Sequence, residues 1–291
     1  MIPPEILKQV RRIEILTNRL VNDTMAGRYS SVFKGHGIEF EEVREYQPGD
    51  DIRAIDWNVT ARTGRPFIKR FVEERELSVM FLVDLSRSMA FGSSRALKQR
   101  AATELCSLLA FSAIKNLDKV GLLLFTDRVE RFIPPKKGRR HVLRLIREVL
   151  SFSPSGDGTD IADALQYLGR ITHRKTVAFL LSDFFCDDLH TPLSIAGRRH
   201  DLIAVHLIDP RETRLPPLGW VRFDDAETGE PITLDASRSD IRDDYAQASV
   251  DHQARVAGMM RAAGVDLVTV YTDQPYLEPF LRLFARRAAR R

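Results

Sequence analysis

Short apolar runs alternate with longer amphipathic segments over most of the chain, from residue 78 onward. Five runs are continuous and apolar, as is typical of strands that are buried on both faces of a sheet. They cover residues 79–84, 120–126, 176–182, 201–208 and 265–271. The segments between and after them have the pattern of helices and cover residues 95–116, 139–150, 160–170, 188–198, 238–262 and 276–290. This alternation predicts an α/β fold with a mostly parallel sheet and helices on both faces.

Two further strand signals depart from the parallel pattern. Residues 129–133 follow the strand at 120–126 after a short turn, which predicts an antiparallel edge strand. The stretch 219–236 has the pattern of a hairpin whose turn contains Thr228 and Gly229. This hairpin is therefore predicted as an insertion within the α/β domain.

The chain before the α/β region has a different pattern. Residues 4–20 place apolar side chains at three- and four-residue spacing after two prolines, which predicts an amphipathic helix. Residues 22–77 mix glycine, proline and many charges with strand-like pieces on either side of the sequence QPGDD. We therefore divide the chain into an N-terminal helix at 1–21, a small β-rich segment at 22–77 and an α/β domain at 78–291.

Composition limits the size of the core, the classes of partner and the cellular compartment that we expect for this protein. With 291 residues, of which 44% are hydrophobic, the chain can bury a sizeable core. A formal net charge of +4 does not by itself indicate nucleic-acid binding, which usually needs a clustered basic face. Cys106 and Cys186 have no CxxC spacing, so we expect free thiols in a reducing compartment. No apolar run is long enough for a membrane span, and the N-terminus lacks the apolar core of a secretory signal. We expect a cytoplasmic protein that can sit beside a membrane through its partners.

Polar side chains lie where two buried strands end and where one helix begins. Asp84, Ser86 and Ser88 follow the first of these strands, Asp183 follows the second, and Thr159 precedes the helix. In open α/β sheets the carboxyl ends of the strands face the ligand crevice. Hydroxyl and carboxylate oxygens are the ligands that a hard divalent cation prefers. The sequence therefore predicts a solvent-open magnesium site, and a cluster held by hydrogen bonds alone is the alternative.

This pattern resembles the metal-ion-dependent adhesion site of von Willebrand factor A domains. That site combines an Asp-x-Ser-x-Ser loop, a threonine from a second loop and an aspartate from a third, and all five positions are matched here. The resemblance implies that Ser86 and Ser88 bind the cation directly, whereas Asp84, Thr159 and Asp183 alternate between direct and water-bridged contact. It implies Mg²⁺, or Mn²⁺ or Ca²⁺ in its place. Neutral hydroxyl ligands leave the cation positively charged, so an Asp or Glu of a partner protein can complete the coordination.

The segment upstream of the α/β domain resembles the signature of a bacterial family, the domain of unknown function 58 family. The likeness is carried by the stretch GHGIEFEEVREYQPGDDIRAIDWNVTARTGRPFIKRFVEERE, and signature and domain together cover roughly residues 27 to 210. The matching residues are Gly35, Gly37, Glu39, Phe40, Arg44, Tyr46, Pro48, Gly49, Asp50, Asp51, Arg53, Ile55, Asp56, Trp57, Ala61 and Arg62. The resemblance implies a von Willebrand factor A-like core with a small β-rich N-terminal subdomain. It also implies a MoxR-type AAA+ ATPase as a partner in chaperone-like assembly or activation of client proteins.

Charges of both signs are dense in the signature segment. They predict ion pairs that fix a loop, and Trp57 among them is either a core anchor or an interface residue. The charged residues concerned are Asp50, Asp51, Arg53, Asp56 and Arg62.

A basic cluster lies at the start of a predicted helix, where cations oppose the helix macrodipole. It consists of Lys136, Lys137, Arg139 and Arg140. This placement makes the cluster a candidate binding site for an acidic partner surface, and a solvated face is the alternative. Nucleic acid is a further alternative for the cluster and for the basic tail. The tail contains Arg286, Arg287, Arg290 and Arg291.

Sequence motifs of common enzymes are absent from the chain. There is no HExxH, no G-x-S-x-G elbow and no G-x-x-x-x-G-K-[ST] loop. One enzyme alternative is a magnesium-dependent, phosphatase-like hydrolase with Asp84 as nucleophile, although the position two residues later is Ser86 instead of a second aspartate. A nucleic-acid-binding module is the other alternative. We predict a non-enzymatic, divalent-metal-dependent protein-interaction domain.

Overall fold

The computed structural model describes residues 4–20, 29, 32–33, 37–74, 77–93, 97–186, 189–224 and 231–290. The chain divides into two compact units, and each is described by itself below. The larger unit combines Met1–Val32 with Ser78–Arg291, and the smaller unit is Phe33–Leu77. The N-terminal helix therefore belongs to the same unit as the α/β region.

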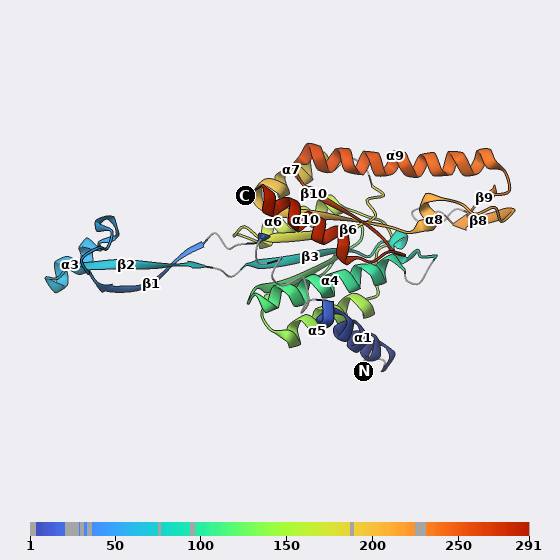
Figure 1. The fold of residues 1–291 in the computed structure, drawn as a ribbon. Coiled ribbons are helices and arrows are strands. Elements are labelled where there is room, and N and C mark those ends of the chain that lie inside the picture. Colours follow the sequence, from blue (N-terminus) through green and yellow to red (C-terminus); the bar gives the residue numbers. More distant parts are fainter. Residues whose placement is uncertain are drawn as a thin grey trace. The chain divides into compact units, whose positions relative to one another are not determined.

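A six-stranded sheet with the order β10-β7-β6-β3-β4-β5 forms the centre of the larger unit (Figure 1). Its strands are β3 (Ser78–Asp84), β4 (Lys119–Phe125), β5 (Val129–Lys136), β6 (Val177–Ser182), β7 (Asp201–Ile208) and β10 (Asp266–Tyr271). Neighbouring strands are parallel except for the edge strand β5, which pairs with β4 in the antiparallel sense. The predicted α/β fold class, with a mostly parallel sheet and an antiparallel edge strand, is confirmed.

Helices cover both faces of this sheet (Figure 1). On one face, α4 packs against α5 and α1, and on the other α6 packs against α7 and α7 against α9. The helices are α1 (Pro4–Leu20), α4 (Lys98–Lys115), α5 (Arg139–Ser151), α6 (Ile161–Ile171), α7 (His190–Arg199), α9 (Ser239–Ala263) and α10 (Leu277–Ala289). These bounds agree with the helices expected from the sequence to within a few residues.

The central strand β3 shows how the sheet divides its side chains between two cores. Met80 and Leu82 lie in a buried cluster with residues of α6, α7 and α9. Phe81 between them stacks on Phe179 of β6, with ring centroids 5.5 Å apart. Phe179 in turn contacts Phe280 of α10. Because successive side chains of a strand point to opposite faces, a continuous apolar run is what a doubly covered strand requires.

The predicted hairpin is present as β8 (Trp220–Asp224) paired antiparallel with β9 (Pro231–Asp235). Its predicted turn at Thr228 and Gly229 lies outside the described residues. A short helix that the sequence did not predict, α8 (Pro210–Thr213), connects β7 to this hairpin region.

The smaller unit is built on an antiparallel pair, β1 (Gly37–Glu45) and β2 (Phe67–Glu74), with a register shift between Phe40 and Glu42. Between these strands lie the 3₁₀ helix η2 (Ile52–Ala54) and the helix α3 (Trp57–Thr63), neither of which was predicted.

The charged residues of the smaller unit include both ion pairs and helix caps. Asp50 pairs with Arg44 at 2.7 Å, so the expectation of a charged contact at this loop is confirmed for Asp50. Asp51 instead caps η2, and the Asp56 carboxylate accepts from backbone N–H groups at the start of α3. The Trp57 side chain is 67% exposed, which removes the core-anchor reading and leaves the interface reading as a prediction.

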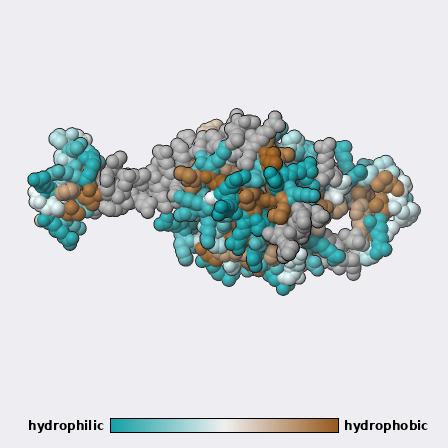
Figure 2. Space-filling model, turned by 90° about the horizontal axis from the view of Figure 1, so that it is seen from below, coloured by the Kyte–Doolittle hydropathy of each residue, from teal (hydrophilic) through white to brown (hydrophobic). Residues whose placement is uncertain are grey.

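The thiols and the exposed apolar side chains have the following environments in the structure. Both cysteines are free, Cys106 buried and Cys186 half-buried, and burial raises the pKa of the Cys106 thiol. None of the described helices has the length and apolar character needed to cross a membrane. Large exposed apolar side chains include Ile15, Leu218 and Trp220. On the face seen in Figure 2, hydrophobic surface is divided into separate patches by hydrophilic residues.

Candidate functional site

The loop after β3 carries three of the five predicted ligands. Asp84 is fully buried, and its Oδ1 accepts a hydrogen bond of 2.8 Å from the Ser86 backbone N–H. The hydroxyls of Ser86 and Ser88 lie 3.1 Å apart. Ser86 precedes the 3₁₀ helix η3 (Arg87–Ala90) but its side chain caps no N–H of that helix. Both hydroxyl oxygens therefore keep lone pairs for a further ligand.

Asp84 is held from the neighbouring strand as well. The Ser182 hydroxyl, at the end of β6, donates to Asp84 Oδ2 at 2.6 Å. Burial and the nearby charge of Asp183 together raise the pKa of Asp84 to about 7, although the hydrogen bonds from Ser182 and Ser86 act in the opposite direction. Asp84 and Asp183 are both fully buried, and a cation stabilises two carboxylates in such an environment.

Thr159 lies on a second loop, which is hydrogen-bonded to the loop that carries Ser86 and Ser88. The Arg87 backbone N–H donates to the Asp157 carbonyl oxygen at 2.9 Å, so the two loops are joined directly. Thr159 itself is half-buried. The following residue, Asp160, caps α6 by accepting from the Asp163 backbone N–H at 2.8 Å, so its carboxylate is used by the helix.

Glu130 of β5 anchors the Thr159 loop, and no sequence signal identified it. Its carboxylate accepts hydrogen bonds from the backbone N–H groups of Ser155 and Gly156, at 2.9 and 2.8 Å. Gly156 is required at this point because a Cβ there would collide with the side-chain oxygens of Thr126 and Asp127. A larger residue at position 156 would therefore force the side chains of Thr126 and Asp127 to move, next to the loop that carries Thr159.

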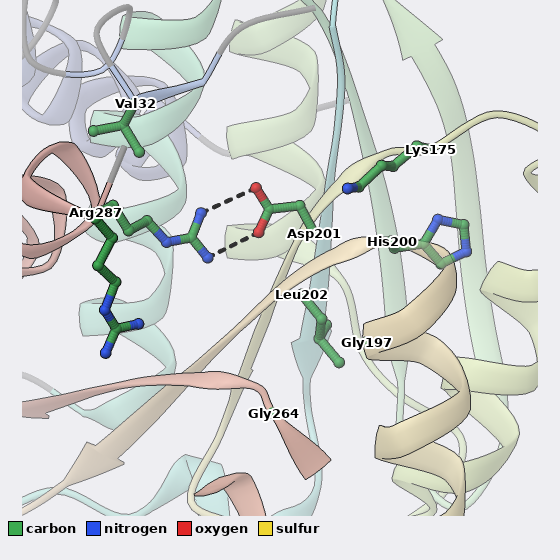
Figure 3. Close-up of a pocket in the computed structure, with 9 residues that line it drawn as sticks. Val32, Lys175, Gly197, His200, Asp201, Leu202, Gly264 and Arg287 are labelled. Carbon is green, nitrogen blue, oxygen red and sulfur yellow. Dashed lines mark hydrogen bonds and ion pairs between the residues drawn. The ribbon is translucent and has the colours of Figure 1, made fainter. Parts of the chain in front are cut away.

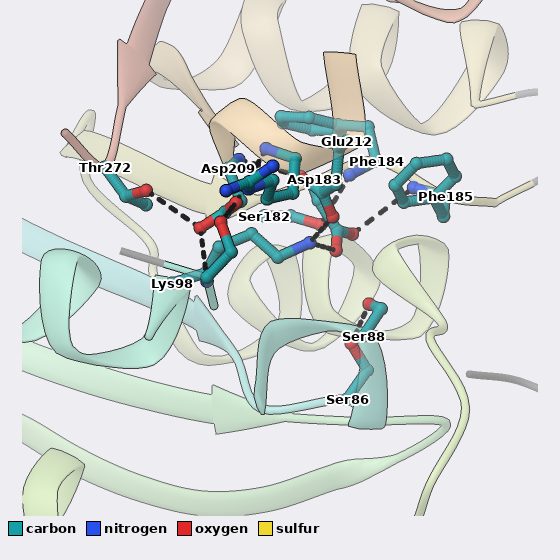
Figure 4. Close-up of polar contacts among 12 residues, drawn as sticks. Ser86, Ser88, Lys98, Ser182, Asp183, Phe184, Phe185, Asp209, Glu212 and Thr272 are labelled. Carbon is teal, nitrogen blue, oxygen red and sulfur yellow. Dashed lines mark hydrogen bonds and ion pairs between the residues drawn. The ribbon is translucent and has the colours of Figure 1, made fainter. Parts of the chain in front are cut away.

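Asp183 lies at the end of β6, next to β3 in the sheet, and is fully buried. Its Oδ2 accepts from the Nζ of Lys98 at 2.7 Å (Figure 4). The same ammonium contacts Glu212 of α8. Burial lowers the pKa of Lys98, but the charges of Asp183 and Glu212 outweigh burial and hold that pKa above its usual value. The sequence analysis did not predict Lys98 or Glu212 as part of this site.

Asp209 organises the rim beside these residues. Fully buried after β7, it accepts from the Ser93 backbone N–H at 2.9 Å and from the Thr272 hydroxyl at 3.1 Å (Figure 4). Its backbone N–H donates to Glu212 at 2.8 Å, which completes a capping box on α8. Asp209 thereby ties the chain after the Ser88 loop to the carboxyl ends of β7 and β10.

A cavity of about 600 Å³ opens next to Ser88. Its lining includes Phe91, Phe185, Tyr245 and His252, and the imidazole of His252 stacks on Phe185 with ring centroids 4.2 Å apart. Among the candidate ligands, Ser88 thus lines a hollow that also contains several aromatic side chains and in which a partner side chain has room to enter.

The donor set fits a hard cation better than a transition metal. Across the described ranges, no three His, Cys, Asp or Glu side chains come together as a metal-ligating group. The candidate site offers two carboxylates and three hydroxyls, and such oxygen donors suit Mg²⁺, Mn²⁺ or Ca²⁺. The structure brings Asp84, Ser86, Ser88 and Asp183 to adjacent strand ends, and it places the Thr159 loop against Arg87.

The basic residues singled out from the sequence have mixed environments. In the cluster at the start of α5, all four side chains are exposed, and Arg139 contacts Glu14 of α1 at 2.6 Å. A partner role for Lys136, Lys137, Arg139 and Arg140 stays a prediction.

The basic tail is partly folded onto the sheet. Arg287 is bound by Asp201 at 2.8 Å and by Asp266 at 2.7 Å, at the amino ends of β7 and β10, and Figure 3 shows its contact with Asp201. Arg286 also contacts Asp266, at 2.9 Å. Arg291 lies outside the described residues. These carboxylates neutralise part of the positive charge on which the nucleic-acid alternative depended.

Comparison with known proteins supports the same assignment of fold and family. The family model "Protein of unknown function DUF58" matches residues 42–255. Uncharacterized protein Rv1480 of Mycobacterium tuberculosis is 31% identical over 289 residues, which cover 98% of this chain and 90% of that protein.

Two solved structures share the fold at low sequence identity. An aerotolerance-related membrane protein from Bacteroides fragilis has a TM-score of 0.51 at 16% identity, covering 74% of this chain and 100% of that one. Conserved hypothetical protein BatB from Bacteroides thetaiotaomicron has a TM-score of 0.50 at 16% identity, covering 73% and 99%. At this identity the likeness concerns the fold alone. From the extent of the family match and the full-length likeness to Rv1480, the chain belongs to the DUF58 family.

Proposed function

We propose that the protein is a non-enzymatic interaction domain that binds a partner through a divalent cation. Asp84, Ser86, Ser88, Thr159 and Asp183 would hold the cation, with Mg²⁺ as the first choice and Mn²⁺ or Ca²⁺ as substitutes. When bound, the cation supplies a positive centre for an acidic side chain of the partner. Family membership and a von Willebrand factor A-like fold suggest a protein-interaction role, and metal dependence is the specific addition made here.

The observation that carries this proposal is the presence, at adjacent strand ends, of two buried carboxylates and two neighbouring hydroxyls, of which the Ser88 hydroxyl belongs to a residue that lines a cavity. Two negative charges that are both fully buried, as on Asp84 and Asp183, are unfavourable unless a cation compensates them. Ser86 and Ser88 add oxygens without adding charge. A Mg²⁺ ion with these ligands keeps residual positive charge on the side of the cavity.

The alternatives fit the geometry less well. A phosphatase with Asp84 as nucleophile needs a second aspartate two residues later as acid and base, and the residue at that position is Ser86. A nucleic-acid-binding face needs free cations, whereas Arg287 is held by two aspartates.

We further propose, from the family resemblance, that the protein acts together with a MoxR-type AAA+ ATPase. The two proteins would act on client proteins in the cytoplasm. An acidic residue of the ATPase or of a client would complete the coordination of the cation. This arrangement makes the cation a link that forms only when both proteins are present.

The test combines metal binding with partner capture. Binding of Mn²⁺ is measured by titration calorimetry and electron paramagnetic resonance for the wild type, for Asp84→Asn and for Asp157→Asn. Asp157 is an exposed carboxylate on the Thr159 loop and serves as the matched control. We expect Asp84→Asn to abolish Mn²⁺ binding and Asp157→Asn to retain it.

The same three proteins are then used as bait in native lysate, with Mg²⁺ or with EDTA, and retained proteins are identified by mass spectrometry. The proposal requires an ATPase of the MoxR type, or another defined protein, to be retained only with Mg²⁺ and an intact Asp84. Equal retention in EDTA would contradict it.

A further inference from the structure

A buried ammonium group lies inside the candidate metal site. Lys98 is the first residue of α4, and its side chain is 0% exposed. Its Nζ lies 2.7 Å from Asp183 Oδ2 and also contacts Glu212, whose side chain is only 17% exposed. The rings of Phe91 and Phe185, at 5.9 and 5.7 Å from Nζ, flank the ammonium. Lysine is almost never fully buried unless it is paired, so this position is built for the charge.

The ammonium occupies the electrostatic role that a divalent cation would take. Asp183 is one of the five candidate ligands, and one of its oxygens is already bound to Lys98. This group includes the buried carboxylates of Asp84 and Asp183, the partly buried carboxylate of Glu212 and the ammonium of Lys98. Lys98 therefore offsets part of a negative charge that would otherwise be left unpaired in the metal-free protein.

We propose that Lys98 is a tethered competitor of the divalent cation. It keeps the site assembled without metal and lowers the affinity of the site for metal, because a positive charge one carboxylate away repels an incoming cation. This inference rests on the proposed function and adds its regulation. An acidic partner side chain offsets the repulsion, so metal and partner bind together more tightly than either binds alone.

The test measures Mn²⁺ affinity, with Mn²⁺ alone as the probe, for the wild type and three variants. Lys98→Met removes the competitor. The double variant Lys98→Met/Glu212→Gln removes one positive and one negative charge, so its net charge equals that of the wild type and its fold does not depend on the single variant being stable. Arg100→Met removes a positive charge from the same helix at a partly exposed position and is the control.

Circular dichroism and thermal unfolding first establish that each variant is folded. We expect the two Lys98 variants to bind Mn²⁺ more tightly than the wild type by about tenfold or more, and Arg100→Met to bind as the wild type does. The charge-matched variant separates the position of the ammonium from the net charge of the site.

The other outcomes separate the two proposals. If the wild type binds Mn²⁺ and the folded Lys98 variants bind it equally or more weakly, Lys98 is not a competitor, and the metal site itself stands. If neither the wild type nor the Lys98 variants bind Mn²⁺, the proposed metal site fails and the competitor role fails with it.

Discussion

Removing the Lys98 ammonium in metal-free buffer should destabilise the protein strongly. In the variant Lys98→Met, Asp183 stays buried at 1% side-chain exposure and loses the cation that lies 2.7 Å away. Breaking a buried ion pair by removing one partner costs about 3–5 kcal/mol, because the remaining charge is left uncompensated. For a folded unit of about 150–250 residues, this corresponds to a fall in melting temperature of roughly 6–20 °C.

The assay is thermal and urea unfolding followed by circular dichroism in EDTA, as a double-mutant cycle. The variants are Lys98→Met, Asp183→Asn and the double variant, with Arg100→Met as a surface control that should cost less than about 1 kcal/mol. Because the double variant contains neither charge of the pair, it should be more stable than the sum of the single effects predicts. Additive effects, or a loss below about 1 kcal/mol for Lys98→Met, would refute the claim that the ammonium neutralises Asp183.

Three further predictions concern other parts of the larger unit. Gly156→Ala should lower the free energy of unfolding by about 1–3 kcal/mol and weaken Mn²⁺ binding, since its Cβ collides with the side-chain oxygens of Thr126 and Asp127. Gly158→Ala should be tolerated, because its Cβ meets its nearest atom at 3.6 Å. Urea titrations compare the two variants. Burial lowers the pKa of His200 to about 4 in the folded protein. The contribution of the neutral imidazole to the free energy of unfolding is therefore fully present above the pKa of the unfolded chain, about 6.5, and falls by up to about 3 kcal/mol as the pH drops toward 4. Unfolding at several pH values should show this loss in the wild type and less of it in His200→Gln. Ellman's reagent should label Cys186 in the native protein and Cys106 only after unfolding, because the Cys106 thiol is buried with a raised pKa.

The sheet and four of the candidate ligands were predictable for the same physical reason. Strands such as β3 and β6 are buried on both faces, so each is a short continuous apolar run that ends at a polar residue. Asp84 ends β3, Asp183 directly follows Ser182 at the end of β6, and two serines follow Asp84 at alternate positions. The rule that ligands gather at the carboxyl ends of parallel strands then places these residues together.

Lys98 was not predictable because its environment is made by distant residues. In sequence it is an ordinary cation at the start of an amphipathic helix, where lysine is normally solvated. Its two partners, Asp183 and Glu212, lie 85 and 114 residues further along the chain. The helix α3 was missed for a local reason, since Val59 and Thr60 in its short sequence favour strands over helices.

The strand order of the sheet has a consequence for how the protein is made. β10 is the last strand of the chain and forms one edge of the sheet, against β7. On the ribosome, β7 is therefore synthesised well before its outer neighbour, and its backbone edge stays unpaired while α9 is added. The strand β10 then pairs with this edge, and Arg287 of α10 links the first residues of the two strands by binding both Asp201 and Asp266. A nascent chain stalled within α9 therefore leaves the backbone N–H and C=O groups at the edge of β7 unpaired, and such an edge is a template for pairing with another chain.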